Sequence, residues 1–502
     1  MQDKLARWST TDKERRFNRL LRLIASRQWL LEAARVTLAS NGAKTPGVDG
    51  VCKNYLQKHL DDEINNLRDE LLNGTYTPGP AKRVYIPKAN GKQRPLGIPT
   101  LRDRIVQRAI LMVMEPIWES DFNEASYGFR PERSVHHAIR RIKGQLQDKG
   151  YSAGRWVIEG DLACYFDTVH HKLLMKCIRK RISDKRLIAL VWKLLKAGHI
   201  DNGLFCAANQ GVPQGGVISP LFSNIMLNEF DQYLEHKYLD LKVRTKRYIW
   251  NNSIQAQRPI AIQQNRQWLP AVSYCRYADD FVVIVNGNKE HAKTIREECK
   301  YFLENKQKLT LNMDKTHITH VDDGFVFLSH RIIRKRGSRN TMRPVTTIPK
   351  DKFKNFISKI SIELSGNHDR NTIDMINSIN RKLSGWANFY KYTDFTATMF
   401  AKADGIIFWK FAHWLAKKYR TSIKSLMMKW FTYPGKGKAK TWKVYEVCCG
   451  KRKTAAIRRL VASPKGQFRY RKPEINPYIH REEVRKSITS RYQNVAMAMS
   501  QS

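Results

Sequence analysis

The chain has 502 residues, of which 42% are apolar and 12 are Trp, so it is long enough to form several domains with substantial cores. Lys and Arg number 90 against 45 Asp and Glu, which gives a net charge of +45. Because self-repulsion on this scale favours a polyanionic partner, we expect a nucleic-acid-binding protein. The eight Cys show no zinc-site or disulfide spacing, and no apolar run approaches a membrane span. A cytoplasmic protein with no membrane partner is therefore expected.

The N-terminal part is predicted to be helical. Apolar residues recur at helical spacing between residues 14 and 40, and this pattern ends at a turn-rich loop that begins at Asn41-Gly42. We therefore take residues 1–67 as an N-terminal helical extension. Predicted strands and helices then alternate through residues 82–284, which indicates an α+β domain.

Two adjacent acids, Asp279 and Asp280, lie between two apolar runs rich in β-branched and aromatic residues. Each run predicts a strand, so the acids are expected at the tip of a β-hairpin. Another apolar strand, Trp156 to Ile158, leads to Asp161. Asp is common in turns and helix caps, so neither pattern alone indicates catalysis. Together, these carboxylates would form an oxygen cluster suited to two Mg²⁺ ions about 4 Å apart and to phosphoryl transfer.

Two loops suit a nucleotide substrate. The segment Gln210–Pro220 contains glycines that allow close backbone approach, and Gln214 within it is expected to pack against an incoming nucleotide. A basic, hairpin-like segment nearer the N-terminus carries Lys88 and Arg94. These two residues could bind the triphosphate of a nucleotide, and they could equally be exposed charges of a loop.

Ser219-Pro220 predicts a helix start, with Pro at the first helical position. Between that helix and the Asp-Asp hairpin, residues 232–272 are polar and mixed in composition. We take this stretch as an insertion whose structure the sequence does not specify.

Beyond residue 330 the chain becomes more basic. Residues 331–355 hold nine basic side chains against one acid, which indicates a charged linker. A helical region dense in aromatic residues follows to about Arg420. Residues 436–472 carry thirteen basic side chains against Glu446 alone, interleaved with aromatic rings. We expect this segment to be a flexible tail for phosphate contact and base stacking on DNA.

An ordered series of segments resembles the reverse-transcriptase blocks of group II intron-encoded proteins. In chain order the segments are IPK and RPLGIP, SYGFRP, EGDLACYFDTV, GVPQGGVISPLFSNIMLNEFD, YCRYADDFVV and LTLNMDKT. Downstream, RKLSGWANFY at Arg381–Tyr390 is similar to the maturase, or thumb, region of the same family. The last reverse-transcriptase block usually contains Leu-Gly, where this chain has Leu328-Ser329, so the turn there is expected to differ in shape.

The resemblance implies an α+β right-hand polymerase with an α-helical thumb. Residues 68–330 would form the fingers and palm of the reverse transcriptase, and residues 331–433 the linker and the thumb or maturase domain. Residues 434–502 would form a basic C-terminal DNA-binding region.

Roles for individual residues follow from the resemblance. The catalytic acids and metal ligands would be Asp161, Asp279 and Asp280, joined by the backbone carbonyl of Leu162. The nucleotide-binding residues would be Lys88, Arg94, Phe166, Gln214 and Lys315, with Phe166 closing the sugar pocket and Lys315 donating a proton to pyrophosphate. Candidate RNA-binding and DNA-binding residues are Trp386, Asn388, Tyr390, Lys436, Lys438, Lys451, Arg452 and Lys453. The implied cofactor is a pair of Mg²⁺ ions, with Mn²⁺ as a substitute.

We therefore expect an RNA-directed DNA polymerase that also binds its intron RNA to assist splicing and supports intron mobility as a ribonucleoprotein. Its partners would be group II intron RNA, an RNA template and a DNA primer or target. Two alternatives stay open: a domesticated reverse transcriptase in host defence or DNA repair, and a maturase or RNA chaperone without polymerase activity. The three acids favour an active enzyme.

Overall fold

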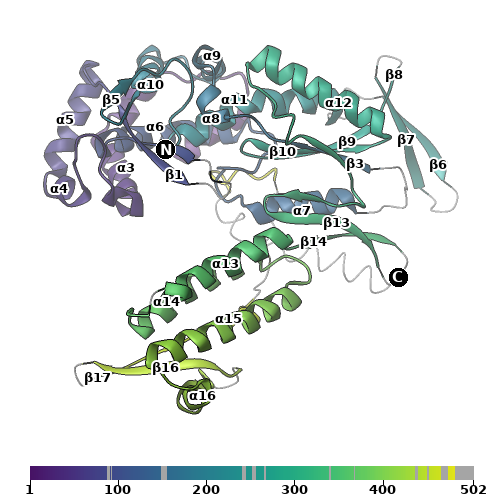
Figure 1. Cartoon of the computed structure of the whole chain (residues 1–502). Coiled ribbons are helices and arrows are strands. Elements are labelled where there is room, and N and C mark those ends of the chain that lie inside the picture. The colour runs from purple at the N-terminus through teal and green to yellow at the C-terminus, as the bar shows by residue number, and fades with distance from the viewer. Residues whose placement is uncertain are drawn as a thin grey trace. The chain divides into compact units, whose positions relative to one another are not determined.

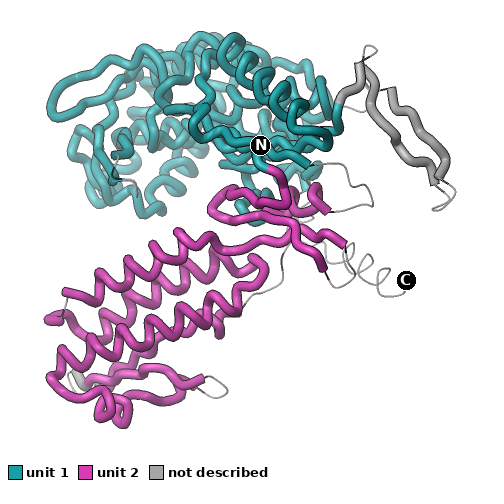
Figure 2. The backbone as a smooth tube through the Cα atoms, turned by 45° about the vertical axis from the view of Figure 1, so that its right-hand side comes forward, with its two compact units in different colours: residues 1–138, 153–319, 470–502 teal, residues 139–152, 320–469 magenta. Residues whose placement is uncertain are grey.

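The computed structural model describes residues 1–87, 91, 93–147, 155–239, 245–251, 256–264, 267–337, 341–366, 368–435, 439–448, 451–464, 468 and 473–480. The chain divides into two compact units, which Figure 2 shows in different colours. Unit 1 comprises residues 1–138, 153–319 and 470–502, and unit 2 comprises residues 139–152 and 320–469. Within the described ranges, no helix is long and apolar enough to cross a membrane.

Unit 1 begins with a group of helices, as the sequence predicts (Figure 1). They are α1 (Gln2–Thr11), α2 (Leu20–Ile24), α3 (Arg27–Ala39), the 3-10 turn η1 (Asn41–Lys44), α4 (Lys53–Lys58), α5 (Leu60–Asn73) and α6 (Leu101–Glu119). The Thr100 side chain caps α6 by accepting a hydrogen bond from the Asp103 backbone N–H. Helices α1, α2 and α3 pack against α6, whose apolar residues belong to the core of unit 1.

Two four-stranded sheets complete the framework of unit 1. The first has the order β2-β1-β4-β5, formed by β1 (Ala81–Pro87), β2 (Gln93–Ile98), β4 (His199–Asp201) and β5 (Leu204–Cys206). The second has the order β11-β3-β10-β9, formed by β3 (Arg155–Gly160), β9 (Ala271–Tyr277), β10 (Asp280–Asn286) and β11 (His317–His320). Strands β9 and β10 form the predicted antiparallel hairpin.

The other helices up to residue 307 belong to unit 1, except that the helix Val135–Leu146 continues beyond residue 138 into unit 2. They are α7 (Val135–Leu146), α8 (Tyr165–Thr168), α9 (His171–Arg181), α10 (Lys185–Lys196), α11 (Ser219–Leu234), α12 (Lys289–Phe302) and the π-helical segments η2 (Glu235–Leu239) and η3 (Leu303–Gln307). Helix α11 begins at Ser219 with Pro220 in its first turn, which confirms the predicted start.

The insertion between α11 and the Asp-Asp hairpin has its own regular structure. After η2 the chain forms an antiparallel sheet of β6 (Thr245–Asn251), β7 (Ala256–Gln264) and β8 (Gln267–Leu269). The sequence left this stretch without a structural assignment.

Unit 2 starts with a three-stranded sheet where the sequence suggested a charged linker, so that prediction is wrong. The strands are β12 (Phe325–Phe327), β13 (His330–Arg336) and β14 (Met342–Thr347). The alternating pattern of a strand was not recognised because a basic residue occupies one of the buried positions. Arg334 is buried, as Ile332 is, and makes a 2.7 Å ion pair with Asp322. In the turn between β12 and β13, Leu328 and Ser329 both have positive φ, at 47° and 62°.

The rest of unit 2 is a helical layer with a second small sheet. The helices are α13 (Lys350–Gly366), α14 (Thr372–Tyr390), α15 (Thr396–Tyr419) and α16 (Ile423–Trp430), and the sheet contains β15 (Phe431–Thr432), β16 (Thr441–Cys448) and β17 (Lys451–Ala456). Figure 1 shows the hairpin of β16 and β17 beside α15 and α16.

The expected flexible tail is therefore wrong for residues 439–448 and 451–464. Trp442, Val444, Ile457 and Leu460 are buried in the same core as the helices of unit 2. Trp442 also donates a hydrogen bond from Nε1 to the Phe408 carbonyl at 3.2 Å. Trp442 and Val444 follow the alternation of a strand, but the many basic residues around them obscured this pattern.

Residues 473–480 pack on helix α6 of unit 1. Arg133 donates to the Pro473 carbonyl at 2.7 Å, and the Asn476 amide donates to Ser120 Oγ at 3.2 Å. The Tyr478 hydroxyl donates to the buried Glu115 carboxylate. This part of the basic C-terminal region is thus built into unit 1.

Candidate active site

Strand pairing brings the three predicted catalytic acids to one end of a sheet. Antiparallel β10 pairs with β3 so that Phe281 lies opposite Gly160. The next pair along this register is Asp280 and Asp161, because Asp161 directly follows β3 and Asp280 begins β10. Asp279 lies in the adjoining turn. The sequence prediction of a strand-end acid facing a hairpin tip is therefore matched by the fold.

Two glycines allow the backbone around this turn to pack closely. A Cβ on Gly160 would lie 2.1 Å from the Phe281 ring, and a Cβ on Gly128 would lie 2.2 Å from the Ala278 backbone nitrogen. Ala278 itself has a positive φ of 57°. The Gly128 segment is joined to the hairpin by a bridge between Ser126 and Arg276, so the loop that begins at Ser126 supports the turn from outside.

The acids share a partly desolvated, negatively charged environment. Burial, together with the neighbouring charges of Asp279 and Asp161, raises the pKa of Asp280 to about 7. Burial also raises the pKa of Asp279, as does the charge of Asp161, whereas Arg94 opposes this shift. These mutual effects mean that the three carboxylates and Arg94 lie within electrostatic range of one another.

A neighbouring segment holds Asp161 from the other side. Lys315 Nζ lies 2.7 Å from Asp161 Oδ2, and the Asn312 side-chain amide donates to the same oxygen at 3.3 Å. The backbone N–H of Asn312 donates to the Asp161 carbonyl at 2.9 Å, and Leu162 forms an isolated antiparallel bridge with Leu311. The pKa of Lys315 is raised by its hydrogen bond to Asp161. The predicted late-motif Lys therefore contacts the site.

Behind the hairpin lies a buried polar network that sequence reasoning missed. Arg276 donates to both carboxylate oxygens of Asp231 at 2.8 and 2.6 Å, to Asn224 Oδ1 at 3.0 Å and to the Ala278 carbonyl at 2.9 Å. Its side chain and that of Asp231 are 1% and 0% exposed. The Tyr274 hydroxyl donates to Asp231 at 2.8 Å. The alternation of β9 puts position 276 on the same buried face as Val272 and Tyr274, but the partner Asp231 lies 45 residues away on α11 and leaves no local signal in the sequence.

The predicted nucleotide loops meet beside the first sheet. The Gly97 N–H donates to the Gln214 carbonyl at 2.6 Å, and Gly215, with φ of 111°, leaves no room for a Cβ against the Gly97 carbonyl. This contact joins the Gln214 loop to β2, which carries Arg94. Lys88 lies outside the described residues.

Phe166 lies on helix α8, five positions after Asp161, and is half-buried. Its ring is 6.5 Å from the exposed Phe129 ring in an edge arrangement, and the Phe166 carbonyl accepts from the Val212 N–H at 2.7 Å. The backbone of the predicted sugar-pocket residue is thus tied to the segment that carries Gln214.

The acids have the right donor chemistry for Mg²⁺, which prefers oxygen ligands. Over the described ranges, however, no group of three or more His, Cys, Asp or Glu side chains is arranged so that it could hold a metal ion. The Lys315 ammonium pairs with Asp161 and supplies a positive charge to this cluster. Metal binding by these residues therefore stays a prediction, and a cation on Asp161 would compete with Lys315.

The aromatic residues predicted to bind RNA are largely packed into unit 2. Trp386 stacks on Phe356 with ring centroids 4.3 Å apart, and Tyr390 is buried with its hydroxyl donating to the Ser329 carbonyl at 3.2 Å. Asn388 between them is exposed. This burial favours a packing role for both rings, and RNA contact at these positions stays a prediction.

The predicted basic contacts fall partly outside the described structure. Lys436, Lys438 and the side chain of Lys451 are not among the described positions. Arg452 and Lys453 are exposed on β17, and the Arg452 guanidinium lies 4.1 Å from the centre of the Tyr445 ring. Both side chains are exposed, and their contact with a phosphate backbone stays a prediction.

Comparison with family models matches both units. Residues 86–332 match the model described as reverse transcriptase (RNA-dependent DNA polymerase), and residues 353–431 match the group II intron maturase-specific domain. The first match contains Asp161, Asp279, Asp280 and Lys315, and the second contains Trp386 through Tyr390.

Individual relatives agree with these matches. Protein YkfC of Escherichia coli is 66% identical over 361 residues, which cover 72% of this chain and 95% of YkfC. The group II intron-encoded protein LtrA of Lactococcus lactis is 34% identical over 64% of this chain and 58% of LtrA. A putative COX1/OXI3 intron 1 protein of Saccharomyces cerevisiae is 29% identical, and the alignment spans 84% of this chain but 56% of that protein. The chain belongs to the group II intron reverse transcriptase/maturase family.

Proposed function

We propose that this chain is an RNA-directed DNA polymerase of the right-hand type, encoded by a group II intron, that also binds the intron RNA. The observation that carries the proposal is the register of β3 and β10, which makes Asp161 and Asp280 neighbours beside Asp279. This acidic strand end lies inside the segment that matches the reverse-transcriptase model.

In this proposal Asp161, Asp279 and Asp280 hold Mg²⁺ together with the Leu162 carbonyl. Bound Mg²⁺ supplies charge that favours ionisation of the primer 3′-hydroxyl and stabilises the pyrophosphate leaving group. The protein positions these ligands through the hairpin and through the Asn312 contacts with Asp161. Asp280 has a raised pKa and must lose its proton before it binds a cation.

Other residues around the acids would orient the nucleotide. Arg94 acts on the charge of Asp279, so its guanidinium is close enough to the acids to neutralise phosphate charge beside them. Lys315, which lies 2.7 Å from Asp161, would donate a proton to the departing pyrophosphate. Phe166 and Gln214 would then contact the sugar and the nucleotide from the loop side.

The second part of the proposal concerns intron RNA. Unit 2 contains the maturase-specific match at residues 353–431, and LtrA, which matches this chain over 355 residues, is itself named a group II intron-encoded protein. We infer that unit 2 binds folded intron RNA, assists splicing and keeps the protein in a ribonucleoprotein that inserts into DNA.

Primer extension tests the polymerase part. The full chain, Mg²⁺, a DNA primer and either an RNA or a DNA template should yield full-length product, with activity on the RNA template required. Extension on DNA alone would contradict the assignment as a reverse transcriptase. Binding without extension on either template would instead support a maturase or RNA chaperone without polymerase activity.

The intron part needs a separate test. Group II intron RNA transcribed from the sequence that flanks this reading frame should splice faster at low Mg²⁺ when the protein is added. Absence of any intron RNA around the reading frame would favour a domesticated polymerase in host defence or DNA repair, and it would leave the polymerase proposal intact.

A further inference from the structure

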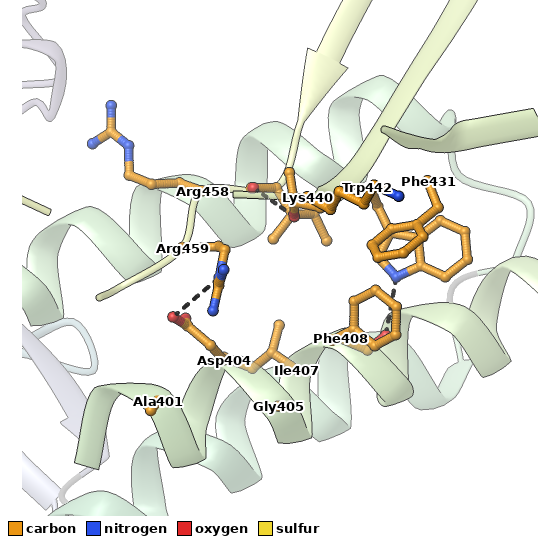
Figure 3. Close-up of a pocket in the computed structure, with 12 residues that line it drawn as sticks. Ala401, Asp404, Gly405, Ile407, Phe408, Phe431, Lys440, Trp442, Arg458 and Arg459 are labelled. Atoms are coloured by element: carbon orange, nitrogen blue, oxygen red, sulfur yellow. Dashed lines mark hydrogen bonds and ion pairs between the residues drawn. The ribbon is translucent and has the colours of Figure 1, made fainter. Parts of the chain in front are cut away.

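Unit 2 contains a pocket of about 400 Å³ between helix α15 and the β16–β17 hairpin (Figure 3). This volume lies in the range of roughly 300–1,000 Å³ that is usual for small-ligand sites. Its lining residues are Ala401, Asp404, Gly405, Ile407, Phe408, Phe431, Lys440, Thr441, Trp442, Ile457, Arg458 and Arg459. We propose that this pocket receives one unpaired nucleotide of a bound nucleic-acid strand, with the base inside and the phosphate at the rim.

Small residues on α15 open the floor of the pocket. Ala401 and Gly405 are one helical turn apart and both are exposed, and a Cβ on Gly405 would meet nothing within 4 Å. Gly inside a helix costs about 1 kcal/mol relative to Ala, so its place in the middle of α15 brings no benefit to the helix itself. In Figure 3 the backbone at Gly405 lies below the open space between Arg459 and the aromatic side chains.

One wall of the pocket is aromatic. Phe408 packs between Trp442, at 5.2 Å and 23° between rings, and Phe431, at 5.4 Å. Trp442 is fully buried and fixes the position of Phe408, whereas Phe408 and Phe431 are only half-buried. Their remaining ring surface is suited to a flat, apolar group such as a nucleobase.

The opposite wall and the rim carry charge. Asp404 accepts hydrogen bonds from the Leu460 and Val461 N–H groups, at 2.8 and 3.1 Å, and Arg459 lies 3.8 Å from it. Lys440 lies at the rim over the Phe431 ring, at 5.5 Å. Arg458 is exposed and points outward in Figure 3. The lining thus holds three cations and one acid.

This distribution of charge fixes the orientation of the ligand. A phosphate placed deep in the pocket would meet the Asp404 carboxylate, whereas a neutral base would not. At the rim, Lys440 and Arg458 attract phosphate, and both belong to the basic stretch of residues 436–472. The ligand must therefore place a neutral group beside Asp404 and phosphates near the rim. A nucleotide within a strand does both, because its base can enter the pocket while the neighbouring phosphates follow the rim.

This inference deepens the proposed handling of nucleic acid by unit 2, and the Gly405→Leu variant tests it. Leucine is a better helix former than glycine and meets no atom at Cβ, so the helix is kept while the side chain fills the pocket. The matched control is Gly144→Leu, since Gly144 is also exposed inside a helix with nothing within 4 Å, and it does not line the pocket. Both variants are made in the full chain.

The measurement is the affinity for a short single-stranded RNA, for the DNA of the same sequence and for an abasic strand of equal length. We expect Gly405→Leu to weaken binding of at least one natural strand by about 5- to 150-fold, the effect of one lost stacked base. Binding of the abasic strand should not change, and Gly144→Leu should bind all three strands like the unaltered chain. The natural strand, RNA or DNA, whose affinity falls more in Gly405→Leu is the one that the pocket prefers.

Equal affinity of Gly405→Leu and the unaltered chain for both natural strands would overturn the proposal, and so would an equal loss on the abasic strand. Primer extension on a pre-annealed template separates this result from the proposed polymerase function. The unaltered chain could fail to extend primers while Gly405→Leu still loses base-dependent binding. That result would contradict the polymerase proposal and would support the proposal that the pocket binds a nucleotide.

Discussion

At the residue scale, the turn that carries Asp279 and Asp280 is held by a charge pair that is buried. Arg276 joins Asp231 on one side to the Ala278 carbonyl on the other, directly before Asp279 and Asp280. Loss of one partner from a buried ion pair typically costs about 3–5 kcal/mol, because the other charge stays buried and unpaired. The pair therefore links the stability of unit 1 to the position of the acids.

Arg276→Met should lower the free energy of unfolding by about 3–5 kcal/mol. Adding Asp231→Asn should recover part of this loss, since the buried charge is gone and Asn can still accept from the Tyr274 hydroxyl. Primer extension should remain low in the double variant, because nothing then donates to the Ala278 carbonyl. Urea unfolding and extension rates measure the two effects, and restored extension in the double variant would show that Arg276 acts only through stability.

Phe166 is expected to select the sugar of the incoming nucleotide. Removing its ring in Phe166→Ala should raise ribonucleotide over deoxyribonucleotide incorporation about tenfold, which equals about 1.4 kcal/mol of discrimination. Single-nucleotide kinetics measure the ratio. Phe129→Ala is the control, because its ring touches Phe166 from the exposed side. An unchanged ratio in Phe166→Ala would mean that this ring only packs.

At the element scale, the hairpin of β16 and β17 is part of unit 2. Trp442 is fully buried in the core that α14, α15 and α16 form. Removing a buried Trp side chain costs about 3–5 kcal/mol, so Trp442→Ala should destabilise unit 2 by this amount. A chain that ends near Tyr433 should lose folded unit 2, and intron-RNA binding with it. Thermal unfolding checks both.

The matched surface variant is Arg452→Gln on the same hairpin. Arg452 is exposed, so its loss should leave the unfolding temperature unchanged. If it contacts duplex DNA, the log–log salt slope of binding should become shallower by about 0.9. Two results would contradict the assignment of Trp442 to the core of unit 2 and of Arg452 to its surface. One is a truncated chain that keeps unit 2 folded, and the other is an Arg452→Gln variant that unfolds at as low a temperature as Trp442→Ala.

Glu115 on helix α6, which accepts a hydrogen bond from Tyr478, makes the stability of unit 1 sensitive to pH. The pKa of Glu115 is raised from an ordinary value of 4.5 to about 7, because burial and the Glu119 charge outweigh the opposing effects of the Tyr478 hydroxyl and Arg108. The folded chain therefore keeps a proton that the unfolded chain releases between these values. This contribution to the unfolding free energy falls as pH rises from about 4.5 to 7.

Glu115→Gln should make the unfolding free energy less dependent on pH over this interval, because Gln cannot release a proton. Urea unfolding at several pH values between 4.5 and 8 measures the slope. Glu290→Gln is the control, since Glu290 is an exposed carboxylate on α12. An identical slope in Glu115→Gln and the unaltered chain would contradict the assignment of the raised pKa to this group.

At the scale of the whole molecule, the structural elements predicted from the sequence were most accurate where the local residue pattern and the tertiary pairing agree. The hairpin at Asp279-Asp280 and the helix start at Ser219 follow from alternation and capping chemistry alone. The closeness of Asp161 to Asp280 needed the pairing of two strands far apart in the chain, and the resemblance supplied that expectation. Neither source indicated the Arg276–Asp231 pair, because a buried partner across 45 residues leaves no local periodicity.

Basic composition misled the prediction in unit 2. Strands form at His330–Arg336, Met342–Thr347, Thr441–Cys448 and Lys451–Ala456, although Lys and Arg are frequent in these segments. Long basic side chains can pair or lie at the surface while alternate residues enter the core, as Trp442 and Val444 do. Charge density predicted a nucleic-acid partner, which the match to a maturase-specific domain supports, but it gave no information on whether the segment folds.

The measurement that tests the central claim most directly compares Asp279→Ala with the unaltered chain in primer extension on RNA, alongside binding of the same template. Because the acids organise the chemistry whereas distant Lys and Arg side chains hold the strand, nucleotide addition should be abolished while RNA affinity stays almost unchanged. Asp161→Ala and Asp280→Ala should behave alike. Extension by Asp279→Ala at a rate close to that of the unaltered chain would contradict the assignment of this site.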